Sequence, residues 1–305
     1  MVKLTNTKNL PQEIVRSVQS DSYTRGKSTI SATGLLQSPR QRVLAKEYDD
    51  KIVLDVSDQI WKLLGTACHY VMEKANEGQE DIIAEERMYA QINGWTVSGQ
   101  FDSMSIKDKT LKDLKVTSAW TVMRAMSEGK IEWEQQLNIY AWLFRQNRNE
   151  ELEKLEIITV NRDWSLRQKQ NSGADYPDSN ISVIPIKMWT EQEQKDFIYE
   201  RVNLHQEAEG EYLISGTLPP CSDVERWKQP DAYRVIKPRR VRALRVLATD
   251  QEAKDYINKS AEKGLTIEFA KGESRKCKDY CLSLIHISEP TRRRGISYAV
   301  VCLKK

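Results

Sequence analysis

The sequence lacks any apolar run long enough to cross a lipid bilayer, and its polar N-terminus lacks the apolar core of a secretory signal. We therefore expect a soluble, cytoplasmic protein with no role at a membrane. Cysteine is also scarce, with five residues in a chain of 305. A chain of this length is not a small protein held together by disulfides, so its cysteines are more suited to binding a metal ion or a metal cluster. Its length allows one large domain or two small ones.

The end of the chain differs from the rest. Leu282–Arg292 resembles a reading-frame translation of a transposon-type sequencing adapter, and Ile296–Lys305 resembles the flow-cell primer that follows such an adapter. We therefore expect residues 282–305 to be an artefact rather than a natural basic tail. This segment holds five basic residues and one acidic residue, whereas the whole chain has a net charge of +3. Residues 1–281 are then close to neutral, and net charge gives no support to nucleic-acid binding.

The hydrophobic pattern predicts an α/β protein with a mixed sheet flanked by helices. Pro185 predicts that the strand containing it lies at a sheet edge, because proline cannot donate to a strand neighbour. A polar stretch over 168–180 is expected to be a loop. The predicted helices are 55–76, 132–145 and 191–210, and the predicted strands are 82–90, 95–106, 111–117, 155–161 and 182–186.

Composition also suggests how the chain is divided. Residues 1–27 are polar and mixed in charge, so we expect a loosely ordered lead-in. Residues 28–215 contain the predicted α/β core. A Pro-Pro-Cys segment after Gly216 opens a cysteine-bearing C-terminal extension over 216–281, which the adapter-like segment 282–305 follows.

Two aspartates and a lysine form the first candidate site. Asp102 ends one predicted strand and Asp113 begins the next across a turn, so a hairpin would bring both carboxylates to one metal ion. Strand alternation puts Asp113 and Lys115 on the same face, and the Leu114 carbonyl is a further oxygen ligand. Mg²⁺ prefers such oxygen ligands. Hydrolysis of a phosphodiester needs a metal to activate water and a cation such as Lys115 to hold that water or stabilise developing charge.

Three more side chains fit the same chemistry. Gln136 and Tyr140 are four residues apart on a predicted helix, so their polar ends share a face and would order Lys115 or contact a phosphate. His69 would add a nitrogen ligand, which favours Mn²⁺ as an alternative to Mg²⁺. Taken singly, an Asp-x-Lys sequence is often a solvated strand and a lone histidine is often a core residue. Their joint occurrence in this order predicts a metal-dependent phosphodiesterase site.

These residues resemble the motifs of the RecB-like branch of the PD-(D/E)xK nucleases. The motifs Gly-x-x-Asp, Asp-x-Lys-Thr/Ser and Gln-x-x-x-Tyr correspond to Gly99–Asp102, Asp113–Ser118 and Gln136–Tyr140, and the metal-binding histidine of the family falls on His69. The resemblance covers roughly residues 60–160. It implies a restriction-endonuclease-like core and a DNA exonuclease that uses Mg²⁺ or Mn²⁺. Glu86 is a further outer carboxylate, with Glu85 as its competitor.

The resemblance also implies a biological setting. Phage recombination exonucleases and the RecB-like nucleases of CRISPR adaptation share the motifs, so the implied role is DNA recombination or repair in a bacterium or a phage-infected host. The implied partners are single- or double-stranded DNA ends and a recombination or annealing protein. The alternatives are a structure-specific or restriction-type endonuclease and a non-catalytic DNA-end-binding subunit. The intact Asp/Asp/Lys set argues against the last, since a degenerate site usually loses one of these residues.

Three cysteines, Cys221, Cys277 and Cys281, form a second candidate site. Several RecB-like nucleases bind a 4Fe–4S cluster through one distant cysteine and a C-terminal group of three, so the resemblance implies such a cluster here. A cluster needs four thiolates, and we expect the fourth to lie in coding sequence that the adapter-like segment has replaced. Cys302 belongs to that segment. A pair of buried free cysteines and a zinc site are the alternatives.

The stretch Arg234–Arg245 has the densest positive charge outside the tail. As a strand or ribbon it would follow a DNA backbone, and Trp227 and Tyr233 nearby would stack on unpaired bases. The alternatives are a solvated strand face balanced by acidic neighbours, and aromatic rings that are buried in a core.

Overall fold

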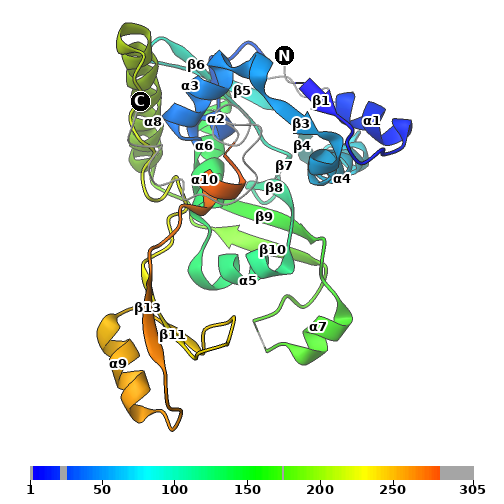
Figure 1. Cartoon of the computed structure of the whole chain (residues 1–305). Helices are drawn as coiled ribbons and strands as arrows, with labels where there is room; N and C mark the ends of the chain where they lie inside the picture. Colours follow the sequence, from blue (N-terminus) through cyan, green and yellow to red (C-terminus); the bar gives the residue numbers. More distant parts are fainter. Residues whose placement is uncertain (1–2, 21–25, 174, 282–305) are drawn as a thin grey trace. The chain divides into compact units, whose positions relative to one another are not determined.

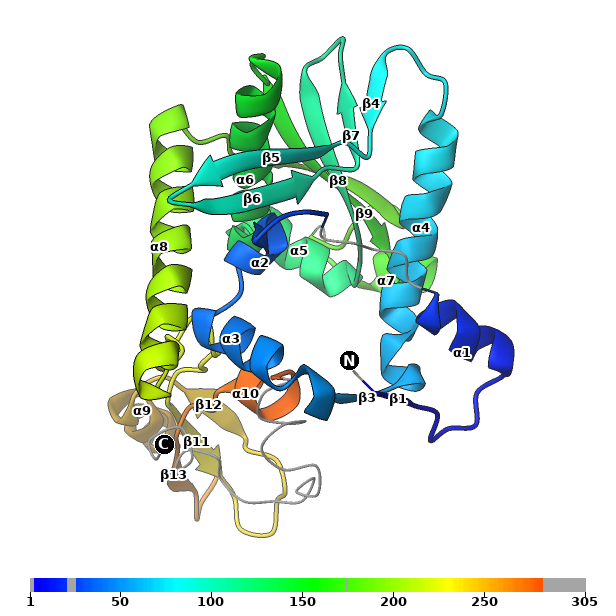
Figure 2. The same cartoon turned by 90° about the horizontal axis from the view of Figure 1, so that it is seen from above.

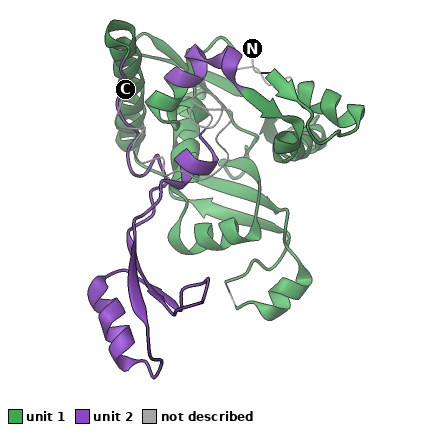
Figure 3. Ribbon diagram, viewed as in Figure 1, with its two compact units in different colours: residues 1–42, 53–216 green, residues 43–52, 217–305 purple. Residues whose placement is uncertain are grey.

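The structure, a computed structural model, describes residues 3–20, 26–173 and 175–281. The chain forms two compact units (Figures 1 and 3): residues 1–42 with 53–216, and residues 43–52 with 217–305. The adapter-like residues 282–305 lie outside the described residues. Within the described residues, no helix combines the length and apolarity that a bilayer crossing requires.

The centre of the first unit is a mixed five-stranded sheet with the strand order β10-β9-β8-β7-β4. Strands β8 and β9 are parallel, and the other neighbours are antiparallel. Strand β10 lies at the edge, which confirms the prediction from Pro185. The strands are β4 (Ile82–Ala84), β7 (Ser103–Ser105), β8 (Thr110–Thr117), β9 (Lys154–Asn161) and β10 (Ile181–Ile186).

Helices pack on this sheet and complete the predicted α/β architecture. Figure 2 shows α4 (Ile60–Asn76) and α6 (Ile131–Arg148) flanking it. Helix α6 is buried along most of its length because its apolar residues occupy all sides. The longest helix, α8 (Glu191–Ser215), begins at a capping box between Thr190 and Glu193. The core includes Phe101, Leu111, Leu137, Leu143, Phe144 and Ile157, each with no exposed surface.

A second, three-stranded sheet has the order β2-β6-β5, formed by β2 (Ile30–Ser31), β6 (Trp95–Gln100) and β5 (Arg87–Ile92). The predicted strands 82–90 and 95–106 are therefore each broken in two, and their halves belong to different sheets. The first break lies at Glu85, whose φ of 52° is left-handed and cannot continue a strand. The second lies at Asp102. The sequence marks both breaks, because the apolar alternation changes phase between Phe101 and Met104, and the charged residues 85–87 follow the apolar residues 82–84.

The N-terminal segment differs from the loosely ordered lead-in that its composition suggested. Strand β1 (Lys3–Thr5) pairs in parallel with β3 (Val53–Asp55), and helix α1 (Gln12–Gln19) follows it. The Asp55 carboxylate joins these segments, because it accepts hydrogen bonds from Thr7 N at 2.8 Å and Thr5 Oγ1 at 2.9 Å. These bonds, with those from Ser57, lower the pKa of Asp55 below its usual range.

Short elements connect these parts. Helix α5 (Ala119–Glu128) was not predicted, and it begins where Ser118 Oγ accepts a hydrogen bond from Thr121 N at 3.1 Å. Helix α7 (Leu166–Asn171) starts just before the stretch expected to be a loop and extends into it, capped by Ser165 in the same way. The remaining elements are α2 (Ala32–Leu35), α3 (Pro39–Glu47) and the 3₁₀ turns η1 (Asp49–Lys51) and η2 (Val56–Gln59).

The second unit contains a three-stranded antiparallel sheet with the order β12-β11-β13. Its strands are β11 (Ala232–Ile236), β12 (Arg245–Leu247) and β13 (Thr266–Ala270), and its helices include α9 (Asp250–Lys259) and α10 (Arg275–Asp279). Only a few of the residues described in this unit, such as Val235 and Ala253, are fully buried. A core this small stabilises the unit less than the extensive core of the first unit.

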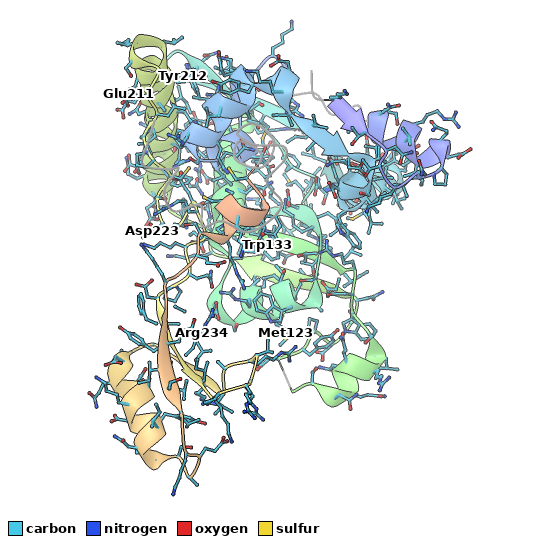
Figure 4. All side chains as sticks on the ribbon, in the orientation of Figure 1. Met123, Trp133, Glu211, Tyr212, Asp223 and Arg234 are labelled. Atoms are coloured by element: carbon cyan, nitrogen blue, oxygen red, sulfur yellow. The ribbon has the colours of Figure 1, made fainter. Side chains whose placement is uncertain are left out.

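The basic stretch Arg234–Arg245 is only partly strand: it includes the end of β11 and the first residue of β12, and its residues 237–244 form the connection between these two paired strands. Figure 4 marks Arg234 and Asp223 in this unit, and Met123 and Trp133 on α5 and α6 of the first. The two aromatic residues singled out for stacking lie against other rings: Trp227 on Tyr280 and Tyr233 on Phe269, each with centroids 5.4 Å apart. A role for the ribbon in DNA binding stays a prediction.

Candidate metal and active site

Asp102 occupies the junction between β6 and β7, where the chain passes from one sheet to the other. Its Oδ2 accepts a hydrogen bond from the backbone N–H of Leu114 on β8. The register that pairs Ser103 with Lys112 leaves no β7 residue in ladder contact with Leu114, so the Asp102 side chain takes the place of a strand neighbour. The hairpin β7–β8 thus brings Asp102 beside Asp113, as the sequence predicted.

Three potential ligands converge on this junction. One ligand atom each from His69, Glu85 and Asp102 lies within 4.8 Å of the other two. His69 Nδ1, on α4, lies 3.1 Å from Asp102 Oδ1. The hydrogen bond to Asp102 raises the pKa of His69 above its ordinary value, although burial opposes the shift. His69 therefore belongs to a polar cluster rather than to the apolar core.

Glu85 was the weaker sequence candidate, and the structure places it in the cluster. Its backbone is left-handed, with φ at 52°, and its N–H donates to the Asp102 carbonyl at 3.1 Å. A left-handed glutamate costs free energy that the surrounding structure must supply, and such residues concentrate at functional sites. Burial and the negative charge of Asp102 raise the pKa of Glu85.

A chain of hydrogen bonds fixes the Glu85 carboxylate. Gln100 Nε2 donates to Glu85 Oε2 at 2.6 Å, and Arg87 Nη2 donates to Gln100 Oε1 at 2.5 Å. Glu86, the preferred sequence candidate, is directed elsewhere and forms an ion pair with Arg148, whose Nε lies 3.2 Å from Glu86 Oε1. Of the two neighbouring glutamates, Glu85 is thus the one whose carboxylate lies in the cluster. The left-handed backbone at Glu85 decides this, and no sequence pattern showed it.

Asp113 and Lys115 lie on the same side of β8, as strand alternation predicted. Lys115 Nζ lies 2.6 Å from Asp113 Oδ2. Asp113 is 2% exposed, and burial raises its pKa to about 6, with Lys115 opposing the shift and Asp102 adding to it. Asp113 is absent from the three-residue ligand group and instead contacts Lys115 and Gln136. The Leu114 carbonyl leaves the strand on the same side as its N–H, toward Asp102.

Gln136 and Tyr140, both on α6, are connected to the Asp113–Lys115 ion pair by hydrogen bonds. Gln136 Nε2 donates to Asp113 Oδ1 at 3.3 Å and to the Tyr140 hydroxyl at 2.7 Å. Both residues are buried. Gly99 permits this arrangement, because a Cβ atom there would lie 2.8 Å from Tyr140 Cδ1 and 2.8 Å from Leu143 Cδ1. Close packing against Tyr140 and Leu143 thus explains why the Gly-x-x-Asp motif has a glycine at position 99.

The three candidate cysteines belong to the second unit. Among the described residues, His69, Glu85 and Asp102 are the only group of three or more side chains close enough to bind a metal, and Cys221, Cys277 and Cys281 form no such group. Cys281 is buried and the other two are partly exposed. The iron–sulfur cluster stays a prediction.

Comparisons with known proteins give distant similarities. No family model and no curated protein matches the chain. The crystal structure of SSO0001 is 18% identical with a TM-score of 0.42, and the match covers 63% of this chain and 84% of that one. The alkaline exonuclease LHK-Exo from Laribacter hongkongensis is 16% identical with a TM-score of 0.32, covering 50% and 71%. A phage-related exonuclease from Haemophilus somnus 129PT is 16% identical with a TM-score of 0.31, covering 68% and 83%.

Proposed function

We propose that this chain is a metal-dependent nuclease of the RecB-like PD-(D/E)xK type, which hydrolyses DNA from its ends. One observation carries the proposal: His69, Glu85 and Asp102 converge within 4.8 Å, next to a buried Asp113 that pairs with Lys115. An ordinary surface cluster of charges does not contain a glutamate with a left-handed backbone beside a buried aspartate that pairs with a lysine on the same strand.

The residues present fit a hard divalent cation. His69, Glu85 and Asp102 would hold it, with Asp113 and the Leu114 carbonyl beside them. Carboxylate and carbonyl oxygens suit Mg²⁺, and the imidazole extends the set to Mn²⁺. Such a cation, when bound, neutralises charge on the phosphate and acidifies the attacking water.

The other residues position this chemistry. The Lys115 ammonium can donate hydrogen bonds to the attacking water or to a phosphate oxygen as negative charge develops there. Asp113 holds that ammonium at 2.6 Å, so the lysine does not sample many rotamers. Gln136 holds Asp113 in turn, and Tyr140 holds Gln136. The two α6 residues are therefore positioning residues rather than groups that touch the substrate.

Two other functions use the same site. A structure-specific or restriction-type endonuclease would have the same metal ligands, and a non-catalytic DNA-end-binding subunit would retain only the fold. The complete set of His69, Asp102, Asp113 and Lys115 supports an active enzyme. We place the enzyme in phage or bacterial recombination or repair, acting with a recombination or annealing protein, and with a 4Fe–4S cluster at Cys221, Cys277 and Cys281.

One experiment separates these functions. Wild type and Lys115→Ala are incubated with end-labelled linear DNA and closed circular DNA, with and without Mg²⁺. We expect Mg²⁺-dependent loss of linear DNA only, abolished in Lys115→Ala. Lys112→Ala is the matched control, because Lys112 lies on the same strand but on the opposite face. Cutting of closed circles would favour an endonuclease, and full activity in Lys115→Ala would overturn the site assignment.

A further inference from the structure

Trp61 is an exposed tryptophan that the proposed site does not use. Its ring is on α4, and its side chain is 57% exposed. The Arg162 guanidinium lies over this ring, 4.2 Å from its centroid. Arg162 is itself exposed, and among the described residues it takes part in no ion pair. An exposed aromatic face beside an uncompensated cation offers both of the contacts by which proteins bind single-stranded nucleic acid.

The position of this pair relative to the proposed site follows from α4. Trp61 and His69 are eight residues apart, which corresponds to about 12 Å along the helix axis and about 80° around it. The two side chains thus leave α4 in neighbouring directions. A ligand bound at His69 that extends about 12 Å along this helix can therefore reach Trp61.

The strand register gives a second separation, which is measured along the sheet. Lys115 pairs with Thr159, and Thr117 pairs with Asn161, in the parallel register of β8 and β9. Arg162 follows directly, and its N–H donates to the Thr117 carbonyl at 2.9 Å. Arg162 is thus two to three residues beyond Lys115 along the sheet, or about 7–10 Å. At about 3.4 Å per nucleotide along one stacked strand, that is two to three nucleotides.

We propose that Trp61 and Arg162 bind an unpaired nucleotide of the DNA strand, two to three nucleotides from the phosphodiester at the Asp102–Lys115 site. The base stacks on the indole, and the guanidinium contacts the neighbouring phosphate. This inference rests on the proposed function, since it takes DNA as the ligand. A second exposed aromatic residue, Trp120, follows Ala119, whose N–H donates to Asp163 Oδ1 at 2.7 Å. Trp120 is 61% exposed, but its cation, Arg124, is already paired with Glu128.

The test measures binding without catalysis. A fluorescein-labelled single-stranded 20-mer is titrated with the Lys115→Ala protein in EDTA, and fluorescence anisotropy gives the Kd. We expect Trp61→Ala to raise the Kd about tenfold, because the stacking surface for one base is lost. Trp61→Phe keeps most of the affinity because it keeps an aromatic face. Thermal unfolding checks that the variants fold, as expected for an exposed side chain.

The matched control lies on the same helix. Tyr70 is 58% exposed and has Lys74 at 5.6 Å from its ring centroid, but it points to the opposite side of α4 from Trp61. Tyr70→Ala should leave the Kd unchanged. An equal loss in Tyr70→Ala and Trp61→Ala, or no loss in Trp61→Ala, would overturn the proposal.

An abasic scan then locates the base. The Kd of each oligonucleotide with one abasic position is measured with two proteins. One carries Lys115→Ala alone, and the other carries Lys115→Ala together with Trp61→Ala. We expect an abasic position two or three nucleotides from the strand end to weaken binding when Trp61 is present, with no further loss in Trp61→Ala. Additive losses at every position would overturn the assignment to Trp61. The readout is separate from the nuclease assay, in which a Lys115→Ala protein that still degrades DNA would overturn the proposed function instead.

Discussion

The Asp102 carboxylate accepts a hydrogen bond from the backbone N–H of Leu114 while its other oxygen lies 3.1 Å from His69 Nδ1. One side chain therefore completes the edge of β8 and belongs to the ligand cluster. These two roles can be separated by substitution, because the first needs only an acceptor oxygen and the second needs a negative charge.

Asp102→Asn and Asp102→Ala should accordingly differ in stability but not in activity. The asparagine carbonyl can still accept from Leu114 N, whereas alanine leaves that N–H without its partner, which costs about 1–3 kcal/mol. We expect both variants to lose nuclease activity and only Asp102→Ala to lose several degrees in Tm. Equal Tm values in the two variants would contradict the structural role of the hydrogen bond.

Glu85 and Glu86 form a natural pair of test and control for metal binding. Glu85 lies in the ligand cluster, and Glu86 is paired with Arg148. We expect Glu85→Gln to weaken Mn²⁺ binding at least tenfold, about the loss seen even for residues that only support a ligand, as measured by calorimetry or by electron paramagnetic resonance of free Mn²⁺. Glu86→Gln should bind Mn²⁺ like wild type. The reverse order of affinities would return the assignment to Glu86.

Gly99→Ala should disturb the α6 support without touching any ligand. The new Cβ would meet the Tyr140 ring and Leu143 at 2.8 Å, so one of them must move. We expect a loss of about 1–3 kcal/mol in unfolding free energy from overpacking, and a fall in kcat as Gln136 loses its Tyr140 partner. Gly210→Ala in α8 meets no atom within 4 Å and should instead stabilise the protein slightly. A Gly99→Ala protein as active and stable as wild type would show that Tyr140 tolerates displacement.

His205 should make the stability depend on pH. It has no exposed surface, its Nε2 donates to the Leu35 carbonyl at 3.2 Å, and burial lowers its pKa to about 4. The unfolded chain, with a histidine pKa near 6.5, takes up the proton first as pH falls. Stability is therefore complete above pH 6.5 and declines between pH 6.5 and 4, with each unit of pKa difference worth about 1.4 kcal/mol.

Denaturant unfolding between pH 7.5 and 4.5 measures this decline, with His205→Gln as the comparison. Glutamine can still donate to Leu35 but cannot take up a proton in this range. We expect a shallower pH dependence in His205→Gln than in wild type. Identical slopes would assign the acid sensitivity to other groups.

The sequence predicted the parts of the site that depend on short-range geometry. Asp113 and Lys115 share a face because strands alternate, and Gln136 reaches Tyr140 because helices repeat every 3.6 residues. The edge position of β10 followed from Pro185 in the same way. The first two relationships need only one element to form, and the third needs only the missing N–H of proline.

What the sequence did not show depends on contacts between elements. Glu85 enters the cluster because its backbone is left-handed, a conformation that glutamate does not favour and that only tertiary contacts enforce. The transfer of the chain from one sheet to the other at each strand break likewise depends on which strands pair. Strand β1 was missed because three residues give no measurable period, and its partner β3 lies about fifty residues away.

The crossing of the chain between two sheets at Asp102 means that the cluster is assembled from separate elements of the first unit. His69 lies on α4, Glu85 between β4 and β5, and Asp102 between β6 and β7. Any ligand that binds to all three side chains would therefore hold both sheets in place, and its binding free energy would add to the stability of the first unit.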